Sequence, residues 1–485
     1  MDIAAPTGLD ALRAEIRRDL ERLNHPPPNW PLGAAGPDGR PALEVLVVGG
    51  GMFGQTAAFA LQRDGVRNLR VVDRAARGEE GPWGTYARMP TLRSPKQLNG
   101  PDLGIPSLTF RAFFEAQHGA AGWDALYKID RLDWRDYLLF LRDVLGIPVE
   151  NGVTLVALEP AGDLIRATLQ GPRGEEAVFA RQVVLASGRE GSGGRNMPVF
   201  PSLPNREAGG DRVFHSAEVI PFERFRGGRI AVLGANASAF DNAATALEAG
   251  VAEVVMSARR PFLPQVNKTR GMSAAFQRGF AGLDDRTRWQ MLTLLAGVSS
   301  PPPHESVLRC LRHPGFSLRF SDAWTDLVPG PEGVTVVTAT ERRPADAAIL
   351  ATGFAVDLGR RPELAAFAPH ALLWRDRVDP EEAARFPELA RYPYLGPGYE
   401  LVEREPGACP ALARLRLFNG SGAISHGVLT PDIPGLASGA LRVSQSVSQA
   451  ILQEELDRHR EALLAFEEPE LLPTPFFVPP DQRRR

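Results

Sequence analysis

Cysteine and long apolar stretches are the first things that this sequence lacks. Its 485 residues include only two cysteines, Cys310 and Cys409, which stand far apart and outside any C-x-x-C spacing. Two distant cysteines are too few for a disulfide framework and lack the close spacing of a zinc site or a dithiol redox centre, so we expect none of these and no metal. No apolar run approaches the roughly 18 residues of a membrane span, and residues 1–7 lack the basic and apolar regions of a secretory signal. These absences predict a cytoplasmic protein with no membrane partner.

A surplus of charge of one sign is also missing. The chain carries 55 Lys and Arg residues against 58 Asp and Glu, a net charge of −3. Because nucleic acids and anionic membranes attract a basic surplus, neither is expected as a partner. With 44% hydrophobic and 23% charged residues the composition is that of a globular protein, and its length favours two or three domains.

What the sequence does contain is a glycine-rich turn close to its N-terminus. A β-branched run at Val45–Val48 predicts a strand, and residues 53–63 have the composition of a helix. At the junction lie Gly49, Gly51 and Gly54, in the spacing G-x-G-x-x-G. In that pattern the first glycine makes the turn, the second lets the backbone approach a pyrophosphate, and the third lets the helix pack on the strand.

An acidic residue completes this first unit. The predicted strand Leu69–Val72 ends in Asp73, at about the distance from the glycines where a carboxylate receives a ribose hydroxyl. The helix N-terminus would face the phosphates with its unpaired N–H groups. Strand, turn, helix, strand and acid together predict a bound dinucleotide.

The pattern occurs a second time, so the chain contains an internal repeat. The predicted strand Ile230–Leu233 meets Gly234, and a helix is expected from about Ser238. Asn236 and Ala239 replace the second and third glycines. Asparagine is the next best residue at positive φ and alanine is a small residue for helix packing, so the turn stays feasible.

The two copies differ at the end of the second strand. Where the first copy has Asp73, the second has Arg259 and Arg260 after the predicted strand Val254–Ser257. Arginine at this position suits a 2′-phosphate, which favours NADP over NAD. Two solvated arginines at a strand end are the alternative.

A long irregular loop follows the first unit. Residues 78–106 are rich in glycine and proline, and loops of this length usually act at sites. Trp83 and Tyr86 lie in the segment GPWGTY and could serve the site or form a small core beneath the loop. Arg93 or Lys96 could hold a substrate carboxylate or the nicotinamide amide, or could contact phosphate.

Hydrophobic periodicity and breakers predict the remaining elements. They are helices at 9–23, 131–145 and 441–464, a meander of strands at 154–158, 165–170 and 177–180, a mostly helical stretch at 271–324, and strands at 334–339, 347–350 and 415–422. Two buried strands, VVLASG at 183–188 and DAAILATGF at 346–354, end in small-residue turns and would bracket the second unit as an insertion. His426 precedes the last helix; a loop histidine is usually a hydrogen-bonding scaffold residue, and a cofactor contact is the alternative.

These residues resemble the class B flavoprotein monooxygenases, which include flavin-containing, Baeyer–Villiger and N-hydroxylating types. The most specific likeness is Asp346–Phe354, which is similar to the D-x-x-x-L-A-T-G-Y motif of N-hydroxylating members. GPWGTY, with Trp83, looks like the segment near the flavin ring, and RLDWRDYL from Arg131 resembles a stretch of the same members. LPQVN ends at Asn267 and is similar to a segment whose asparagine contacts substrate.

The resemblance implies the cofactors and the reaction. FAD would bind in the first domain and NADPH in the second; hydride transfer to the flavin and addition of O2 would form a flavin hydroperoxide that delivers one oxygen atom. The sequence departs from the family at several positions. Among them, Leu92 stands where flavin-containing enzymes have asparagine, Phe354 replaces the final tyrosine of the N-hydroxylating motif, and His304 lies where ornithine and lysine hydroxylases have N-Y-S. We expect N-hydroxylation of a small amine or amino acid. The alternatives are a flavin-dependent NAD(P)H oxidoreductase without oxygenation and a non-catalytic dinucleotide sensor.

The predicted fold class is α/β, with two Rossmann-like dinucleotide-binding domains and the NADP domain inserted in the FAD domain. The expected division is an N-terminal helix and linker at 1–40, the first part of the FAD-binding domain at 41–225, the NADP-binding domain with a helical insertion at 226–344, and the second FAD-binding part with the C-terminal helix at 345–485.

The candidate site residues form three groups. Candidates for contact with substrate are Asn267, Arg93 and Lys96. Candidates for FAD are Gly49, Gly51, Gly54, Asp73, Trp83, Ser187, Gly188, Thr352, Gly353 and Asp432. Candidates for NADPH are Gly234, Asn236, Ser238, Arg259 and Arg260. Asp432 leads into the last helix, whose N-terminus would face the electron-rich end of the flavin ring.

Overall fold

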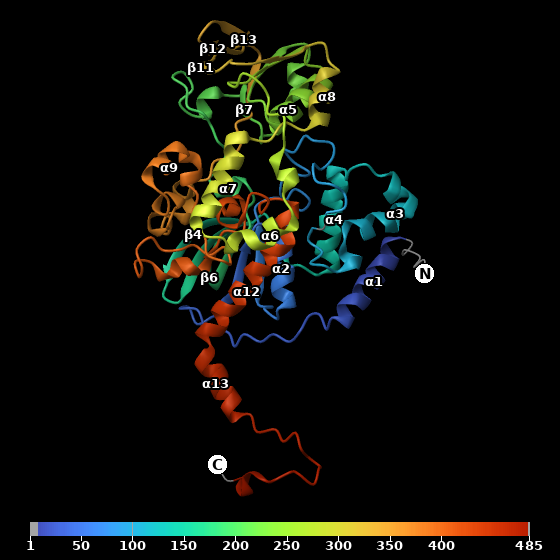
Figure 1. Ribbon diagram of the computed structural model, residues 1–485, viewed down its shortest axis with the longest axis vertical. Coiled ribbons are helices and arrows are strands. Elements are labelled where there is room, and N and C mark those ends of the chain that lie inside the picture. The colour runs from blue at the N-terminus through green and yellow to red at the C-terminus, as the bar shows by residue number, and fades with distance from the viewer. Residues whose placement is uncertain (1–7, 99, 484–485) are drawn as a thin grey trace.

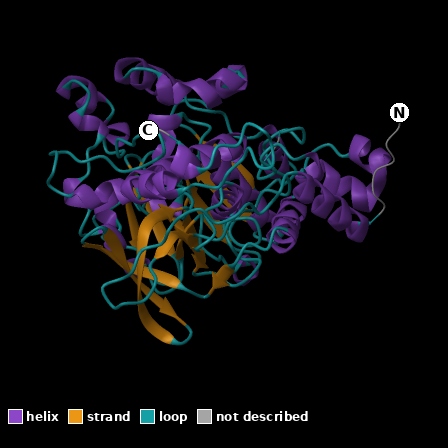
Figure 2. Cartoon of the chain, turned by 90° about the horizontal axis from the view of Figure 1, so that it is seen from below, coloured by secondary structure: helices purple, strands orange, loops and turns teal. Residues whose placement is uncertain are grey.

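Two sheets with parallel cores organise the chain, one in each nucleotide-binding unit (Figure 1). The computed structural model describes residues 8–98 and 100–483, so residues 1–7, where no secretory signal was expected, lie outside the described part. Figure 2 shows the strands gathered together, with helices along one side of them and a further group of helices beside the N-terminus.

The first sheet has the strand order β3-β2-β1-β6-β5-β4, with β15 paired to β6. Its strands are β1 (Leu43–Val48), β2 (Leu69–Asp73), β3 (Val149–Asn151), β4 (Thr154–Ala161), β5 (Leu164–Gly171), β6 (Gly174–Leu185) and β15 (Leu415–Arg416). β3, β2, β1 and β6 run parallel, whereas β4, β5 and β6 form the predicted antiparallel meander. Parallel strands are covered on both faces, which explains why the middle of β1 is entirely buried.

Helices cover this sheet and extend beside it. They are α1 (Leu9–Arg22), α2 (Met52–Arg63), α3 (Phe110–Ala125), α4 (Arg131–Val144), α12 (Leu436–Glu454) and α13 (Leu456–Ala465). Every residue of α2 from Phe53 to Leu61 is buried, and α12 lies against it. α1 buries Leu12, Ile16 and Leu20 at the helical spacing seen in the sequence.

The second sheet has the order β10-β9-β8-β14-β7 and is entirely parallel. Its strands are β7 (Val213–His215), β8 (Arg229–Leu233), β9 (Glu253–Ser257), β10 (Phe316–Arg319) and β14 (Ala347–Leu350). A third, antiparallel sheet consists of β11 (Trp324–Pro329), β12 (Val334–Thr338) and β13 (Arg342–Ala345). The helices of this half and of the segment after it are α5 (Ala237–Glu248), α6 (Ala274–Gly279), α7 (Asp285–Val298), α8 (His304–Leu311), α9 (Pro380–Arg385), α10 (Pro387–Ala390) and α11 (Ala423–His426).

Several predicted elements differ from the observed ones. The two predicted strands at 177–180 and 183–188 are one strand, β6, because its two ends pair with different neighbours, β5 and β1. The predicted helix at 441–464 starts earlier and is divided into α12 and α13 at Glu455. The elements that were not predicted include α3, β3, β7, β10, β11 and β13, and β10 lies in the stretch 271–324 that was expected to be mostly helical. The final strand is only the two residues of β15.

Strand pairing also changes the predicted division of the chain. β14 pairs with β8 and β7, so the strand at 347–350 belongs to the second sheet and not to the second FAD-binding part. β7 likewise lies in the second sheet, although its residues fall within 41–225. The second unit therefore includes strands from both sides of the expected insertion.

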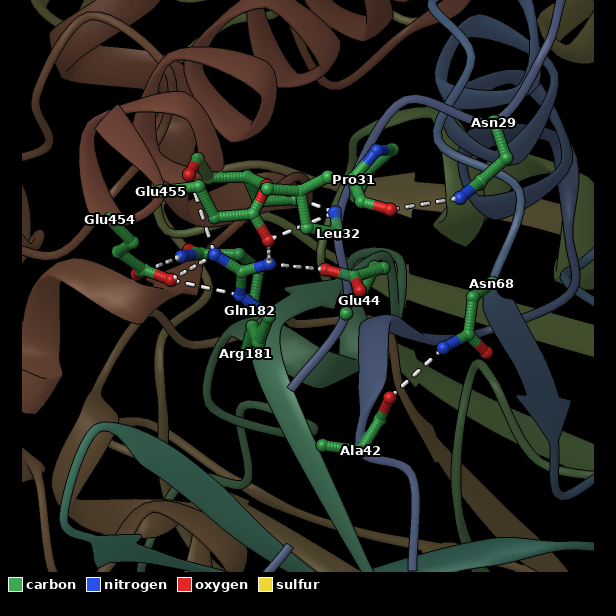
Figure 3. A network of polar contacts seen from close by, with 12 residues as sticks. Asn29, Pro31, Leu32, Ala42, Glu44, Asn68, Arg181, Gln182, Glu454 and Glu455 are labelled. Carbon is green, nitrogen blue, oxygen red and sulfur yellow. Dashed lines mark hydrogen bonds and ion pairs between the residues drawn. The ribbon is translucent and has the colours of Figure 1, made fainter. Parts of the chain in front are cut away.

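A buried ion-pair network holds the N-terminal linker, the first sheet and the end of α12 together (Figure 3). Arg181 of β6 pairs with Glu44 of β1 at 2.9 Å, with Glu454 at 2.7 Å and with Glu455 at 2.5 Å. The linker joins through Leu32, whose N–H donates to Glu455 at 3.0 Å. Buried charges need partners of this kind, and Glu455, which lies between α12 and α13, is one of them. Beyond it α13 has no buried residue and leads away from the body (Figure 1).

Candidate functional site

A cleft of about 510 Å³ lies over the carboxyl ends of β1, β2 and β6 and the N-terminus of α2. Open α/β sheets bind their ligands in this place. Seven of the predicted FAD residues line it: Gly49, Gly51, Asp73, Trp83, Ser187, Gly188 and Asp432. Local patterns were enough to find these, because each lies at the end of a strand, in the loop that follows the first unit, or just before the last helix.

The three glycines of the first turn are needed for three different reasons. Gly49 has φ 107°, and a Cβ there would lie 2.5 Å from the Ala186 carbonyl oxygen. A Cβ on Gly54 would lie 1.7 Å from the Gly49 oxygen, so helix α2 can approach the turn only without a side chain. Gly51 is extended, and the nearest heavy atom to its Cβ position is 3.9 Å away. Since Gly51 lines the cleft, a side chain there would project into the space available to a ligand.

The N-terminus of α2 carries no internal cap. Gly51 offers no side-chain acceptor, and no acidic residue lies in the first turn. α4 and α7, by contrast, are capped by Asp130 and Asp284, which accept from backbone N–H groups of the first turn. An uncapped N-terminus that opens into a cleft fits a dinucleotide pyrophosphate, whose oxygens accept these hydrogen bonds.

Asp73 is held by the turn that it faces. Its Oδ2 accepts from the Gly50 N–H at 2.7 Å and its Oδ1 accepts from the Ala75 N–H at 2.7 Å. Burial raises the pKa of the Asp73 carboxyl above its usual value. Each carboxylate oxygen retains a further lone pair that can accept from a ribose hydroxyl.

Two features close the rim of the cleft. Trp83 is buried edge-on against Trp134 at 6.4 Å between ring centroids while it also lines the cleft, so it serves both as wall and as core. Arg189 pairs with Asp432 at 2.7 Å, which joins the turn after β6 to the segment before α12. Sequence patterns missed Arg189, and also the cleft-lining Arg361, because neither belongs to a recognisable motif.

The second turn adopts the expected shape with one correction. Gly234 has φ 117°, and a Cβ there would lie 2.7 Å from the Ala351 carbonyl oxygen. Asn236 was expected at positive φ, but it is extended at φ −99° and ψ −173° as the N-cap of α5. The second position of the pattern requires room and not a left-handed backbone, as Gly51 also shows. Asn236 and Ser238 are exposed at the N-terminus of α5.

The strand register changes which residue of the second unit corresponds to Asp73. The Gly49 N–H donates to the Val72 oxygen at 2.8 Å, and the Gly234 N–H donates to the Ser257 oxygen at 3.0 Å. Ala258 therefore occupies the position of Asp73, and Arg259 follows it. Arg259 and Arg260 are exposed, and Arg260 donates to Ser299 Oγ at 2.7 Å.

The three predicted substrate residues are not brought together. Asn267 caps a short turn and accepts from Thr269 Oγ1 at 2.6 Å. Arg93 pairs with Asp241 at 2.6 Å, and Lys96 lies 4.7 Å from the centroid of the Trp123 ring and donates to the Trp123 oxygen. None of the three is among the described residues that line the cleft.

The segment Asp346–Phe354 has a structural role in this chain. Asp346 Oδ2 accepts from the Arg229 N–H at 2.7 Å and so fixes the start of β8. Thr352 Oγ1 donates to the Asn196 oxygen, and the Gly353 oxygen accepts from His215 Nε2 at 2.9 Å. Thr352 and Gly353 are outside the described lining of the cleft.

His426 is a scaffold residue. It stacks on Tyr399 at 3.7 Å, and its Nε2 donates to the Gly396 oxygen at 3.1 Å. Burial lowers the pKa of His426 to about 3, so the ring is neutral, and its hydrogen bond fixes the backbone at Gly396.

Two strand–turn–helix units on two sheets with parallel cores, of which the first has a glycine-rich turn that opens into a cleft, are typical of proteins that bind two dinucleotides. A scan against protein-family models finds no match for the chain. The chain is 38% identical over 467 residues to the FAD-dependent urate hydroxylase of Xanthomonas campestris pv. campestris, across 96% of this chain and 97% of that protein. The chain therefore belongs to the FAD-dependent monooxygenases, and the predicted family and the prediction of an enzyme are confirmed.

Solved structures confirm the fold class. The reduced ornithine hydroxylase of Pseudomonas aeruginosa has a TM-score of 0.66 at 18% identity, covering 84% of this chain and all 100% of that one. The ornithine N-hydroxylase of Kutzneria sp. 744, described with reduced FAD, NADP+ and L-ornithine, has a TM-score of 0.64 at 16% identity, over 84% and 99% of the two chains. Among the helices of the described residues, none is long and apolar enough to cross a membrane.

Proposed function

We propose that this enzyme uses FAD and NADPH to transfer one oxygen atom of O2 to urate or to a similarly small, planar, nitrogen-rich heterocycle. The balanced reaction consumes NADPH, a proton and O2 and yields the hydroxylated product, NADP+ and water. The choice of substrate is supported by the similarity to a urate hydroxylase, which extends over 96% of the chain.

The observation that carries the proposal is the open Gly51 position in the cleft beside the uncapped N-terminus of α2. In our proposal Gly49, Gly51 and Gly54 hold the FAD pyrophosphate and Asp73 holds its ribose. Bound FAD would supply the redox chemistry that protein side chains lack, namely acceptance of a hydride from NADPH and activation of O2.

The remaining work of the chain is binding, orientation and exclusion of water. Trp83 covers the cleft from the loop, and Ser187, Gly188 and Asp432 complete its wall. In the second unit, Gly234, Asn236 and Ser238 would hold the NADPH pyrophosphate at the N-terminus of α5, and Arg259 with Arg260 would receive the 2′-phosphate. Thr352 and Gly353 would act indirectly, through their hydrogen bonds to Asn196 and His215.

N-hydroxylation of a small amine or amino acid is the second candidate. It is favoured by the likeness of Asp346–Phe354 to the N-hydroxylating members. The contacts of Asp346, Thr352 and Gly353 weaken that argument, because all three stabilise the fold and none faces the cleft. The motif is therefore better support for the fold than for the substrate.

The test is oxygenation of a substrate panel that contains urate, related purines, ornithine, lysine and simple diamines. NADPH consumption is measured with each, and products formed under labelled O2 are analysed by mass spectrometry. We expect urate or a related purine to accelerate NADPH oxidation and to gain one labelled oxygen atom. Labelled hydroxylamines would favour the second candidate. NADPH oxidation that yields only peroxide with every compound would indicate an oxidoreductase without oxygenation, and a colourless protein that turns over no NADPH would indicate a sensor.

A further inference from the structure

Two arginines fasten the loop that covers the cleft to the second nucleotide-binding unit. Arg88 donates to the Ser216 oxygen at 2.9 Å and to the Glu218 oxygen at 2.7 Å, both just beyond β7. Arg93 pairs with Asp241 of α5 at 2.6 Å. Both arginines follow the cleft-lining stretch that contains Trp83 and Tyr86. The wall of the flavin cleft is thus held from the other unit.

Asp241 is the centre of this attachment. Only 3% of its side chain is exposed, and its Oδ1 accepts from Ser306 Oγ at 2.6 Å while its Oδ2 accepts from Arg93. Arg309 of α8 lies 3.8 Å from the same carboxylate and donates to the Arg88 oxygen at 3.1 Å. A buried carboxylate is stable only with such partners, so the loop, α5 and α8 are tied to one another through Asp241.

The place of Asp241 along α5 gives the attachment a second consequence. The residue lies little more than one helical turn beyond Asn236, the exposed N-cap where we propose that the coenzyme phosphates bind. A helix transmits a displacement of its first turn along its axis as a rigid body. Whatever restrains the N-terminus of α5 therefore also restrains the partner of Arg93.

We propose that Asp241 is a positioning residue that couples occupation of the second nucleotide site to closure of the loop over the flavin cleft. The inference rests on the proposed function in one respect, namely that the second unit binds NADP(H). With the Asp241–Arg93 pair intact the loop excludes water from the cleft; without it the loop opens, although every cleft-lining residue is unchanged.

Tryptic cleavage after Arg93 measures the opening directly and needs no catalytic turnover. Trypsin must bind the Arg93 side chain, which is possible only after its guanidinium leaves Asp241. We expect slow cleavage of the wild-type holoenzyme and slower cleavage with NADP+ present. Asp241→Asn should be cleaved there about tenfold faster or more, since a charge-assisted contact changes an equilibrium by about that factor, and NADP+ should no longer protect it.

Glu248→Gln is the matched control. Glu248 pairs with Arg309 at 2.7 Å, and among the described residues its side chain bonds to neither Arg93 nor Asp241. Its cleavage after Arg93 should equal that of the wild type. Equal rates for wild type and Asp241→Asn, or a lack of NADP+ protection in the wild type, would overturn the proposal.

A second pair of variants guards against misfolding of Asp241→Asn. Arg93→Lys keeps a cation that can reach Asp241, whereas Arg93→Met does not. The fraction of NADPH electrons released as peroxide should rise several-fold in Arg93→Met and be partly restored in Arg93→Lys, with little change in the NADPH KM. Identical behaviour of the two variants would mean that the pair only stabilises the fold. If no substrate is oxygenated by the wild type, the proposed function fails, and the proteolysis result still decides the role of Asp241.

Discussion

The two nucleotide-binding units differ in how closely the helix approaches the turn before it. In the first, a Cβ on Gly54 would lie 1.7 Å from the Gly49 oxygen, so no side chain is possible where α2 meets the turn. In the second, Ala239 occupies the corresponding position and is fully buried. The first turn also opens into a lined cleft, whereas Asn236 and Ser238 of the second are exposed. The comparison fits a resident cofactor in the first unit and an exchangeable coenzyme in the second.

The strand ends differ in the same sense. Asp73 is locked by two backbone N–H groups and retains acceptors for a ribose. Ala258 replaces it in the second unit, which removes a carboxylate that would repel a 2′-phosphate. The absence of the acid, as much as the presence of Arg259, favours NADPH there.

Among the substitutions considered, that of Gly51 should have the largest effect, because it should remove flavin binding from the first unit. In Gly51→Val the branched side chain would fill the open position in the cleft, displacing the pyrophosphate from the N-terminus of α2. Several charge-assisted hydrogen bonds would be lost, so flavin affinity should fall at least roughly a hundredfold. The protein should purify colourless with its helical circular dichroism retained.

The matched change is Asn236→Val in the second turn. It should leave the flavin content at the wild-type level and weaken NADPH binding only. If Gly51→Val stays yellow with full flavin content, the first turn is not the flavin site. If Asn236→Val also loses its flavin, the two turns do not act separately.

An acidic residue at position 258 should reduce the preference of the second unit for NADPH, because the first unit has Asp73 at the corresponding position. Ala258→Asp would place a carboxylate where Asp73 stands in the first unit and would oppose the coenzyme 2′-phosphate. We expect the preference for NADPH over NADH to fall by roughly tenfold to a hundredfold, with NADH binding unchanged or improved. The ratio of kcat/KM for the two coenzymes measures the effect. A uniform loss with both coenzymes would show that position 258 is structural.

Local patterns predicted the two units well because their determinants lie within about thirty residues. Strand, turn and helix at Val45–Arg63 follow from apolar runs and glycine spacing alone. The same reasoning placed Asp73 at the cleft, since the end of a strand is a local property. The same reasoning predicted the wrong φ for Asn236. A glycine in the sequence can indicate either a lack of room for a side chain or a left-handed backbone, and the sequence alone does not distinguish the two.

Non-local pairing accounts for what the sequence could not show. β14 has the pattern of any buried strand, and only its hydrogen bonds with β7 and β8 assign it to the second sheet. Arg93 is a cation in a loop, and nothing in its local sequence indicates that Asp241, far along the chain, lies 2.6 Å from it. The motif at Asp346–Phe354 can be recognised in the sequence. Its contact with the start of β8, where Asp346 accepts from the Arg229 N–H, is seen only in the structure.

The two arginines after β9 should separate by function. Among the described residues Arg259 has no side-chain hydrogen-bond partner, whereas Arg260 donates to Ser299 at 2.7 Å. Arg259→Ala should raise the NADPH KM roughly tenfold, the value of one charge-assisted contact, and leave that for NADH unchanged. Arg260→Ala should have a smaller effect. Steady-state kinetics with both coenzymes measure this, and equal losses for NADPH and NADH would make the pair structural.

The smallest effect should come from Ala239→Gly, which gives the second turn the third glycine of the first. If α5 needed the close approach seen at Gly54, the change would tighten NADPH binding. The buried methyl of Ala239 instead fills space, and glycine costs a helix about 0.5–1 kcal/mol relative to alanine. We therefore expect an unchanged NADPH KM and a thermal midpoint lower by no more than about 4 °C. A fall in the NADPH KM beyond experimental error would show that only the Ala239 methyl keeps α5 away from the second turn. The two units would then differ at this residue and not in the geometry of their backbones.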